Sequence, residues 1–451
     1  MPVFNRYEYC YNNPLKYKEI QKRIGENIPV LDFVAELKEY LMQHGLSNAL
    51  LFTNDSIFTQ NYVGVIKYKN FQFNILPKLI RNTDERDIDE ATQETVINNL
   101  TYMISLTQKL DIKITEHADI NQCENPFLEI LIREYANSLF DSLKKITPKN
   151  YVREENNLNY IKGKLKFTEN IRFNCANQAK FYCEYDEFSE NNKLNQLFLF
   201  ISKSLFSISQ NNENRKVLSF IMNYFCDLPL IPFDKYKAEK IILTRNQQLF
   251  EHPFKLAKMF LQNISVDISK NAIENITLLW DMNLLFEEFV YEIIKRCDLG
   301  YSIHYQKDAK LLINPNNDRK YGNTYVDIYL ENKENNKDII ILDTKYKVNK
   351  GGNSEFENAD IYQICTYCRI HNSNNAILFY PADIDAEIYE DDKKNLYFIR
   401  PKIPYYELNV KLGETVNVHR IMIRLDNKLK DILNNRNELQ KMTNSLVQKL
   451  N

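Results

Sequence analysis

The sequence predicts an α+β protein with more than one domain. The chain has 451 residues, enough for two or three domains that each bury a core of their own. Strand-like alternation of apolar and polar residues occurs near both ends of the chain, and helical spacing of apolar residues is strongest in the middle. We therefore expect a mixed α/β region over residues 1–150, a largely helical region over 151–270 and a further α/β domain over 271–451.

The first region combines helices and strands. The stretch "SIFTQNYVGVIKYKNFQFNILPKL" (56–79) is strand-like, because Phe71, Phe73 and Ile75 alternate with polar residues and so occupy one face. Pro77 is expected to end that strand. Helices are expected over 31–45, where the helical pattern ends at a glycine typical of a C-cap, and over 92–110 and 125–145.

The later regions alternate in character. A polar, strand-like stretch, "YIKGKLKFTENIRFN" (160–174), opens the middle region, and long helices follow it. The third region is expected to begin with a helix over 277–297. After it we expect strands over 302–346, a helix near 359–371, short strands at "AILFYP" and "YFIRP", and a helical C-terminal stretch, "LDNKLKDILNNRNELQKMTNSLVQKLN".

Composition narrows the class of protein. The 58 basic and 60 acidic residues give a formal net charge of −2, so the chain lacks the overall positive charge of a small nucleic-acid-binding protein. An enzyme can still confine its lysines and arginines to one cleft. No run approaches the ~20 apolar residues that cross a bilayer, and the N-terminus has no apolar core of signal-peptide type. We expect a cytoplasmic protein without a membrane partner.

Zinc chemistry is not expected. Of the eight cysteines, only Cys365 and Cys368 form a C-x-x-C pair, and no second pair of ligands lies at metal-binding spacing. The histidines form neither H-x-x-x-H nor H-E-x-x-H. Because the cysteine pair lies within a predicted helix, both thiols are expected to be free and partly buried.

An acid and a base end the apolar run "IIILDTKYKV" (339–348). Asp343 and Lys345 are two residues apart in a strand, so their side chains leave the same face, and Thr344 is expected to point the other way. The strand "TYVDIYL" carries Asp327, and a hairpin through the turn 331–338 would bring it to Asp343. Two facing carboxylates repel unless a cation lies between them, and such oxygen ligands suit Mg²⁺ or Mn²⁺. A neighbouring lysine can orient or deprotonate water, so the pattern is typical of a metal-dependent nuclease.

The alternative is the polar end of an ordinary strand. The D-x-K triplet is weak by itself, because the chain contains others, among them four at Asp111–Lys113, Asp318–Lys320, Asp391–Lys393 and Asp426–Lys428. None of these four follows a β-branched apolar run that has a second strand-borne aspartate upstream. The context therefore favours the triplet at Asp343 and leaves the alternative open.

Two further segments carry candidate residues. Glu287 lies at the border of the apolar stripe of the predicted helix 277–297, where it can reach the metal or belong to a solvated flank. In "ADIYQICTYCRIH", Gln363 and Tyr367 are four residues apart and share a helical face. They can brace the lysine, contact a DNA backbone or simply pack.

Together these features resemble the PD-(D/E)xK nucleases and, more narrowly, the McrC family of McrBC-type restriction systems. The resemblance rests on four blocks in the family's order: "NYVGVIKYKNFQFNILPKL", "YIKGKLKFTENIRFN", "CEYDEFSENNKLNQLF" and "WDMNLLFEEFV". It implies that residues 271–451 form a PD-(D/E)xK domain with a central mixed sheet flanked by helices. One departure is that Val326 stands where the motif often has proline.

The resemblance also implies the roles of the candidate residues. Asp327 and Asp343 correspond to the metal ligands and Lys345 to the catalytic lysine. Glu287 corresponds to the helix acid. The accessory helix motif falls on Gln363 and Tyr367. The implied reaction is Mg²⁺-dependent hydrolysis of phosphodiester bonds in double-stranded, modified DNA.

A partner is implied as well. McrC-type chains act with McrB, an AAA+ GTPase ring that recognises modified DNA, and their N-terminal part inserts into the ring and stimulates GTP hydrolysis. Region 1–150 is accordingly expected to dock on the ring, and a polar or basic tip within 56–80 is the place to look for the residue that stimulates GTP hydrolysis. This chain has no G-x-x-x-x-G-K-[ST] loop, so we expect it to bind no nucleotide itself. Two alternatives stay open: a stand-alone repair nuclease and a non-catalytic GTPase-activating adaptor.

Overall fold

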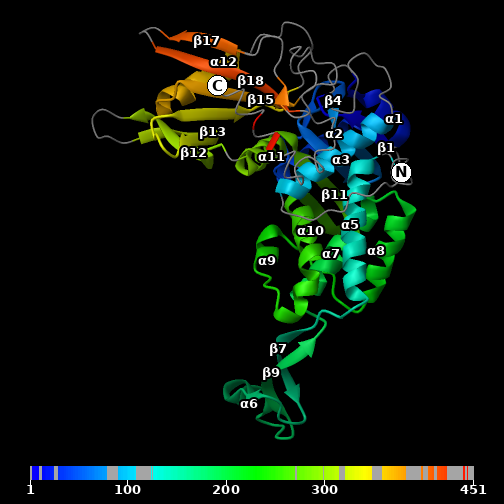
Figure 1. The fold of residues 1–451 in the computed structure, drawn as a ribbon. Coiled ribbons are helices and arrows are strands. Elements are labelled where there is room, and N and C mark those ends of the chain that lie inside the picture. The colour runs from blue at the N-terminus through cyan, green and yellow to red at the C-terminus, as the bar shows by residue number, and fades with distance from the viewer. Residues whose placement is uncertain are drawn as a thin grey trace.

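The computed structural model of the chain is a mixed structure of helices and several sheets, as the α+β part of the predicted fold class requires (Figure 1). Within the described residues no helix is both long and apolar enough to span a membrane. The described residues are 3–9, 13–24, 29–78, 90–107, 123, 125–269, 272–297, 299–313, 320–347, 358–381, 398–399, 405–410, 414–423, 440–441 and 444.

A five-stranded sheet organises the N-terminal part. Its order is β1 (Val3–Tyr7), β6 (Phe71–Leu76), β5 (Tyr62–Tyr68), β11 (Ala272–Asp281) and β10 (Ile264–Ser269). The first pair is parallel and the other pairs are antiparallel. A small sheet adds β2 (Leu15–Lys16), β4 (Ser56–Thr59) and β3 (Leu50–Phe52). The strands predicted within 56–79 are confirmed, and β6 ends before Pro77.

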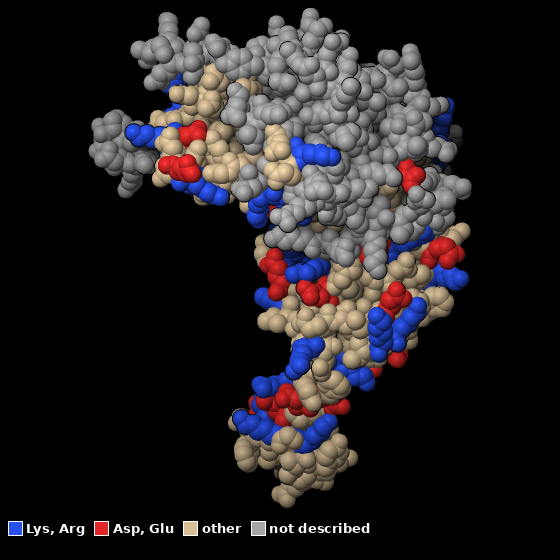
Figure 2. Space-filling view, in the orientation of Figure 1, with Lys and Arg blue, Asp and Glu red and all other residues tan. Residues whose placement is uncertain are grey.

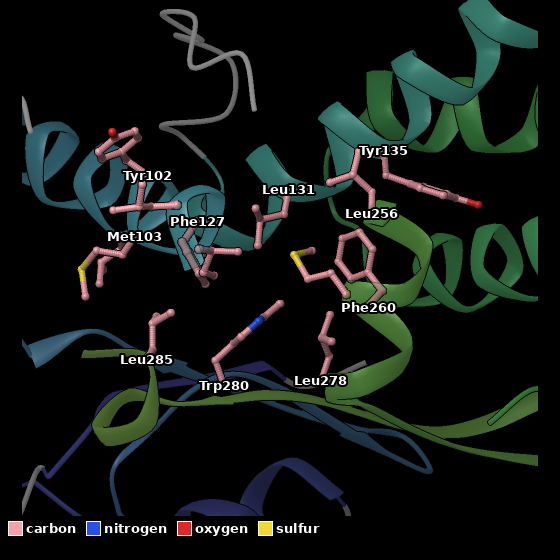
Figure 3. Packing of buried hydrophobic residues seen from close by; sticks show 14 of the residues in the cluster. Tyr102, Met103, Phe127, Leu131, Tyr135, Leu256, Phe260, Leu278, Trp280 and Leu285 are labelled. Carbon is pink, nitrogen blue, oxygen red and sulfur yellow. The ribbon is translucent and has the colours of Figure 1, made fainter. Parts of the chain in front are cut away.

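Helices cover both faces of this sheet. Alternation along β5 sends Ile66 and Tyr68 to one apolar cluster and Val63 and Val65 to another. The first cluster includes α1 (Tyr17–Ile24) and α2 (Val30–Gln43). The second, shown in Figure 3, includes α3 (Glu90–Thr107), α5 (Pro126–Leu143) and α10 (Glu251–Asn263). The predicted helices are confirmed, and Gly45, with φ 72°, follows α2 as expected of a C-cap.

The strand β11 corrects the helix predicted over 277–297. Residues up to Asp281 are extended and pair with β5, and only α11 (Met282–Arg296) is helical. The apolar run "ITLLW" has no periodicity that distinguishes a buried strand from a buried helix. Gly64 of β5 permits the pairing, because a Cβ there would overlap the carbonyl oxygen of Leu278. Asp281 then caps α11 by accepting from the backbone N–H of Asn283 at 2.9 Å.

The middle region contains a small sheet that the sequence did not reveal in full. A module over residues 150–189, here called the projecting module, extends away from the rest of the molecule in Figure 1. It contains β7 (Asn150–Leu158), β8 (Lys164–Leu165), α6 (Phe167–Asn174) and β9 (Phe181–Ser189). The stretch 160–174, expected to be strand-like, is therefore helical over its second half. The helices predicted beyond it are confirmed as α7 (Lys193–Ile208) and α8 (Asn212–Tyr224), with the short α9 (Lys235–Glu239) after them.

A seven-stranded mixed sheet forms the C-terminal part. It contains β12 (Tyr301–Ile313), β13 (Lys320–Asn332), β14 (Ile339–Thr344), β15 (Asn375–Pro381), β18 (Glu414–Ile423), β16 (Phe398–Ile399) and β17 (Tyr405–Val410). Leu342 packs toward α11, and the adjacent Ile341 packs toward α12 (Asn358–His371), so the two helices cover opposite faces. The predicted strands and the helix near 359–371 are confirmed. The predicted helical C-terminal stretch lies almost wholly outside the described residues.

Candidate functional site

The hairpin of β13 and β14 brings Asp327 and Asp343 together, as its sequence predicted. The antiparallel register pairs Ile328 with Leu342, so the next position on each strand holds one of the two aspartates. Asp343 is only 1% exposed. Two carboxyl groups therefore face each other at the end of a buried hairpin.

Thr344 holds Asp327 in place. Its backbone N–H and its hydroxyl both donate to Oδ2 of Asp327, each at 2.8 Å. The expectation that Thr344 turns away from the site is therefore wrong. Strand alternation does not decide its direction, because Thr344 is the last residue of β14 and its N–H is free to bind a side chain. A hydroxyl residue between the acid and the lysine is the signal that sequence reasoning missed.

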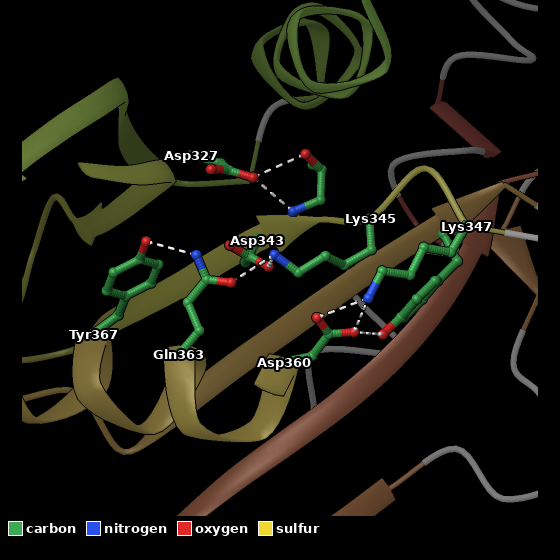
Figure 4. A network of polar contacts seen from close by, with 9 residues as sticks. Asp327, Asp343, Lys345, Lys347, Asp360, Gln363 and Tyr367 are labelled. Atoms are coloured by element: carbon green, nitrogen blue, oxygen red, sulfur yellow. Dashed lines mark hydrogen bonds and ion pairs between the residues drawn. The ribbon is translucent and has the colours of Figure 1, made fainter. Parts of the chain in front are cut away.

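Lys345 is braced from the helix α12. Its ammonium lies 2.5 Å from Oδ2 of Asp343 and donates to Oε1 of Gln363 at 2.8 Å. Gln363 in turn donates through Nε2 to the hydroxyl of Tyr367 at 2.8 Å (Figure 4). Burial disfavours the charge of Lys345, but the carboxylate of Asp343 raises its pKa overall. The helical spacing of Gln363 and Tyr367 thus produces the brace, one of the arrangements that the sequence allowed.

Glu287 approaches the same place from α11. Its Oε1 accepts from Nε2 of Gln306 at 3.0 Å, and its charge interacts with that of Asp327. Gln306 has φ 49° and is skipped by the ladder between β12 and β13, opposite Asp327. A non-glycine residue in this region of backbone space is strained, and such residues concentrate at functional sites. Sequence reasoning missed Gln306, since nothing in the strand pattern marks it.

Burial raises the pKa of all three acids. It raises the pKa of Asp343 to about 7, with the charge of Asp327 adding to the effect and Lys345 opposing it. It also raises the pKa of Asp327, against the hydrogen bonds from Thr344. The pKa of Glu287 rises to about 7, first through burial and then through Asp327. Asp343 and Glu287 therefore keep part of their protons near neutral pH, and a bound cation would displace those protons.

The donor set fits a small, hard divalent cation. Apart from the ammonium of Lys345, neither carboxyl oxygen of Asp343 has a hydrogen-bond donor among the described residues. Among the residues that the structure describes, no group of three His, Cys, Asp or Glu side chains is already arranged to hold a metal ion. Two aspartates are nevertheless sufficient for Mg²⁺, which keeps several waters and commonly takes substrate phosphate oxygens.

Cys365 and Cys368 are free, and burial raises the pKa of Cys368 to about 12.

A second ion pair lies beside the site. Nζ of Lys347 is 3.1 Å from both carboxyl oxygens of Asp360, in the first turn of α12. The hydroxyl of Tyr380 donates to Asp360 at 3.4 Å. This pair ties α12 to the chain two residues beyond Lys345. Sequence reasoning missed it, although Lys347 continues the alternation of Asp343 and Lys345.

A family comparison gives the site its context. The family model described as "McrBC 5-methylcytosine restriction system component" matches residues 57–381. The chain belongs to this McrBC family. The match includes the projecting module and all six candidate residues, and it confirms the resemblance to the McrC family. No curated protein matches the chain.

Solved structures of the McrBC system resemble the chain in fold. A chain of the refined half-complex from a tetradecameric assembly of Thermococcus gammatolerans McrB AAA+ hexamers with bound McrC has a TM-score of 0.65 and 17% identity. The likeness covers 99% of this chain and 100% of that one. A chain of the cryo-EM structure of the Thermococcus gammatolerans McrBC complex has a TM-score of 0.45 and 20% identity, over 65% of this chain and 88% of that one. At such identities, likeness shows the fold alone.

Proposed function

We propose that this McrBC-family chain is the Mg²⁺-dependent DNA endonuclease subunit of a GTP-driven restriction complex. The observation that carries the proposal is the cluster of Asp327, Asp343 and Lys345 at one end of a mixed sheet flanked by helices. A PD-(D/E)xK nuclease needs these side chains in this arrangement. Family membership supports a restriction function.

The residues divide the chemistry among them. When bound, a Mg²⁺ ion would polarise the phosphate of the DNA and lower the pKa of a water molecule. Asp327 and Asp343 would hold the ion, and Thr344 keeps Asp327 in position. The raised pKa of Lys345 keeps its side chain protonated, so we assign it to orienting water and stabilising negative charge on the phosphate rather than to accepting a proton. Glu287 is placed to accept a proton near pH 7.

The proposed partner is an McrB-like AAA+ GTPase ring. Within 56–80, where the sequence placed a polar or basic tip, β5 and β6 are largely buried in the five-stranded sheet, and the turn between them exposes Lys69 and Asn70. The projecting module is better placed for docking. Seven large apolar side chains in it are each more than half exposed: Tyr151, Tyr160, Ile161, Phe167, Ile171, Phe173 and Phe188. On the face shown in Figure 2, a belt of Lys, Arg, Asp and Glu side chains separates the uncharged far end of the module from the body of the molecule. Exposed apolar surface bordered by charge is typical of a protein-binding site.

The test is cleavage by the reconstituted complex. Asp343→Ala and Lys345→Ala are assayed with the partner ring, Mg²⁺, GTP and methylated or unmethylated DNA. Both should abolish cleavage of the methylated DNA and leave stimulation of GTP hydrolysis intact. Lys333→Ala, at an exposed turn position, is the matched control and should cut normally.

Other outcomes separate the alternatives. Cleavage by both site variants would show that the site assignment is wrong. Digestion of DNA by the wild-type chain without partner or GTP would instead identify a stand-alone nuclease. A wild-type complex that hydrolyses GTP but never cuts would identify an adaptor.

A further inference from the structure

A buried polar cluster joins the N-terminal sheet to the residue after Lys345. The hydroxyl of Tyr346 donates to Oε1 of Glu8 at 2.9 Å, and the backbone N–H of Lys78 donates to the same oxygen at 3.1 Å. Nζ of Lys78 donates to the carbonyl of Tyr346 at 2.9 Å and lies 3.9 Å from the centre of its ring. Glu8 and Tyr346 are each 2% exposed. These three residues are called the clasp.

Two adjacent strands deliver the acid and the base of the clasp. Glu8 directly follows β1, and Lys78 lies two residues beyond the end of β6, which pairs with β1. Tyr9, next to Glu8, has φ 52° and places its ring 4.6 Å from Nζ of Lys78. An aromatic residue with this backbone conformation is strained, and the strain persists only where the surrounding structure holds it. The end of β1 is thus held in an unfavourable conformation at the clasp.

Tyr346 also sets the backbone of the candidate site. The N–H of Lys347 donates to the carbonyl of Lys345 at 2.8 Å, so Tyr346 is the central residue of a three-residue turn. Its ring lies 5.6 Å from the ring of Phe286, the neighbour of Glu287 in α11. One buried tyrosine therefore contacts the elements that carry both the lysine and the helix acid.

We infer that Glu8 and Lys78 are positioning residues for Lys345 and act on it through Tyr346. The N-terminal sheet would thereby set the geometry of a site that is built on the seven-stranded sheet. The inference rests on the proposed nuclease function. Because misplacing a reacting group by ~1 Å can cost about 100-fold in rate, loosening the turn at Tyr346 should slow cleavage without removing a catalytic group.

The test uses two clasp variants and one matched control. Tyr346→Phe removes only the hydroxyl that reaches Glu8, and Lys78→Met removes the ammonium that holds the turn. Tyr301→Phe is the control, because its hydroxyl donates to Asp338 at 2.6 Å in the same sheet but away from the clasp. Each variant is assayed for single-turnover cleavage in the full complex with Mg²⁺ and GTP. The rate of reductive methylation of Lys345 is measured separately, by mass spectrometry on the folded chain alone.

Both clasp variants should lower the cleavage rate constant by about 10- to 100-fold and leave the DNA concentration for half-maximal rate unchanged. In both clasp variants, Lys345 should also be methylated several-fold faster than in the wild-type chain. Tyr301→Phe should change neither the cleavage rate constant nor the rate of methylation. A further pair of variants tests Glu8: Glu8→Gln keeps an accepting oxygen and should retain more of the cleavage rate than Glu8→Ala. Wild-type cleavage and wild-type methylation in folded clasp variants would overturn the inference. If the wild-type complex does not cut, the proposed function fails, and methylation of Lys345 alone decides the positioning role.

Discussion

In most folded proteins, charged side chains are exposed and large apolar ones are buried. Two regions of this molecule depart from that distribution in opposite ways. The end of the seven-stranded sheet buries charge: Asp343 is almost fully enclosed and faces Asp327. The projecting module exposes apolar surface on α6, here called the tip, where Phe167 and Ile171 are 71% and 68% exposed. Buried polar groups and exposed apolar patches are the informative exceptions in a folded protein.

The difference indicates what each region is built to bind. Buried carboxylates are costly unless a cation or a donor compensates them, and here the charge of Lys345 acts on both Asp343 and Asp327. A divalent ion would supply the missing positive charge. Removing water from exposed aromatic and aliphatic side chains has no free-energy cost when a protein covers them. The comparison therefore supports our proposal that the ion and DNA bind at one region and a protein partner at the other.

The largest effect should come from the tip. Phe167 and Ile171 are four residues apart on α6 and share a face. The double variant Phe167→Ser/Ile171→Ser should weaken binding to the ring by roughly 10²- to 10³-fold, because central apolar anchors each contribute ~2 kcal/mol. Stimulation of GTP hydrolysis, titrated against chain concentration, measures the loss.

The control for the tip variant is Leu31→Ser/Ile242→Ser, which changes two side chains of similar exposure on the body. It should stimulate GTP hydrolysis normally. Equal loss in both double variants would show that general surface polarity, not the tip, governs binding. Neither variant should alter the circular dichroism spectrum.

The next effect concerns stability and pH at the acid cluster. The folded-state pKa of Asp343 is about 7, above its unfolded value of ~3.9, so between these pH values only the folded state holds the proton. Wild-type stability therefore falls as pH rises through this window. Without metal, Asp343→Asn should gain at most about 4 kcal/mol at pH 8 and nothing near pH 4, at ~1.4 kcal/mol per pKa unit.

Urea unfolding of both proteins at pH 4, 6 and 8 in chelator measures this gain. Asp141→Asn, at an exposed position, is the control and should show no comparable trend. A stability difference that is the same at all three pH values would contradict the raised pKa.

The smallest effect should come from the metal. Mg²⁺ at ten times its dissociation constant should stabilise the wild-type chain at pH 8 by about 1.4 kcal/mol, because it binds only the folded state. The variant Asp343→Asn should lose this stabilisation, and the tip variant should keep it. Thermal unfolding with and without Mg²⁺ provides the measurement. Equal stabilisation of Asp343→Asn would place the ion elsewhere.

The sequence by itself determined the local parts of the site. Period-two alternation and one polar turn were enough to predict the hairpin that sets Asp327 opposite Asp343. Period-3.6 spacing placed Gln363 and Tyr367 on one helical face, where they now brace Lys345. These predictions succeeded because each depends on residues that are close in the chain. Four family blocks in order then added what spacing alone could not.

Only the tertiary structure decided the long-range parts. β11 pairs with β5, more than 200 residues earlier in the sequence, and its buried apolar run looks the same as a helix before a partner strand is known. The contact of Tyr346 with Glu8 spans 338 positions, and no periodicity encodes it. The projection of residues 150–189 was equally invisible. Hydrophobic patterns specify which face of an element is buried, but they leave open what buries it, because the hydrophobic effect is not directional.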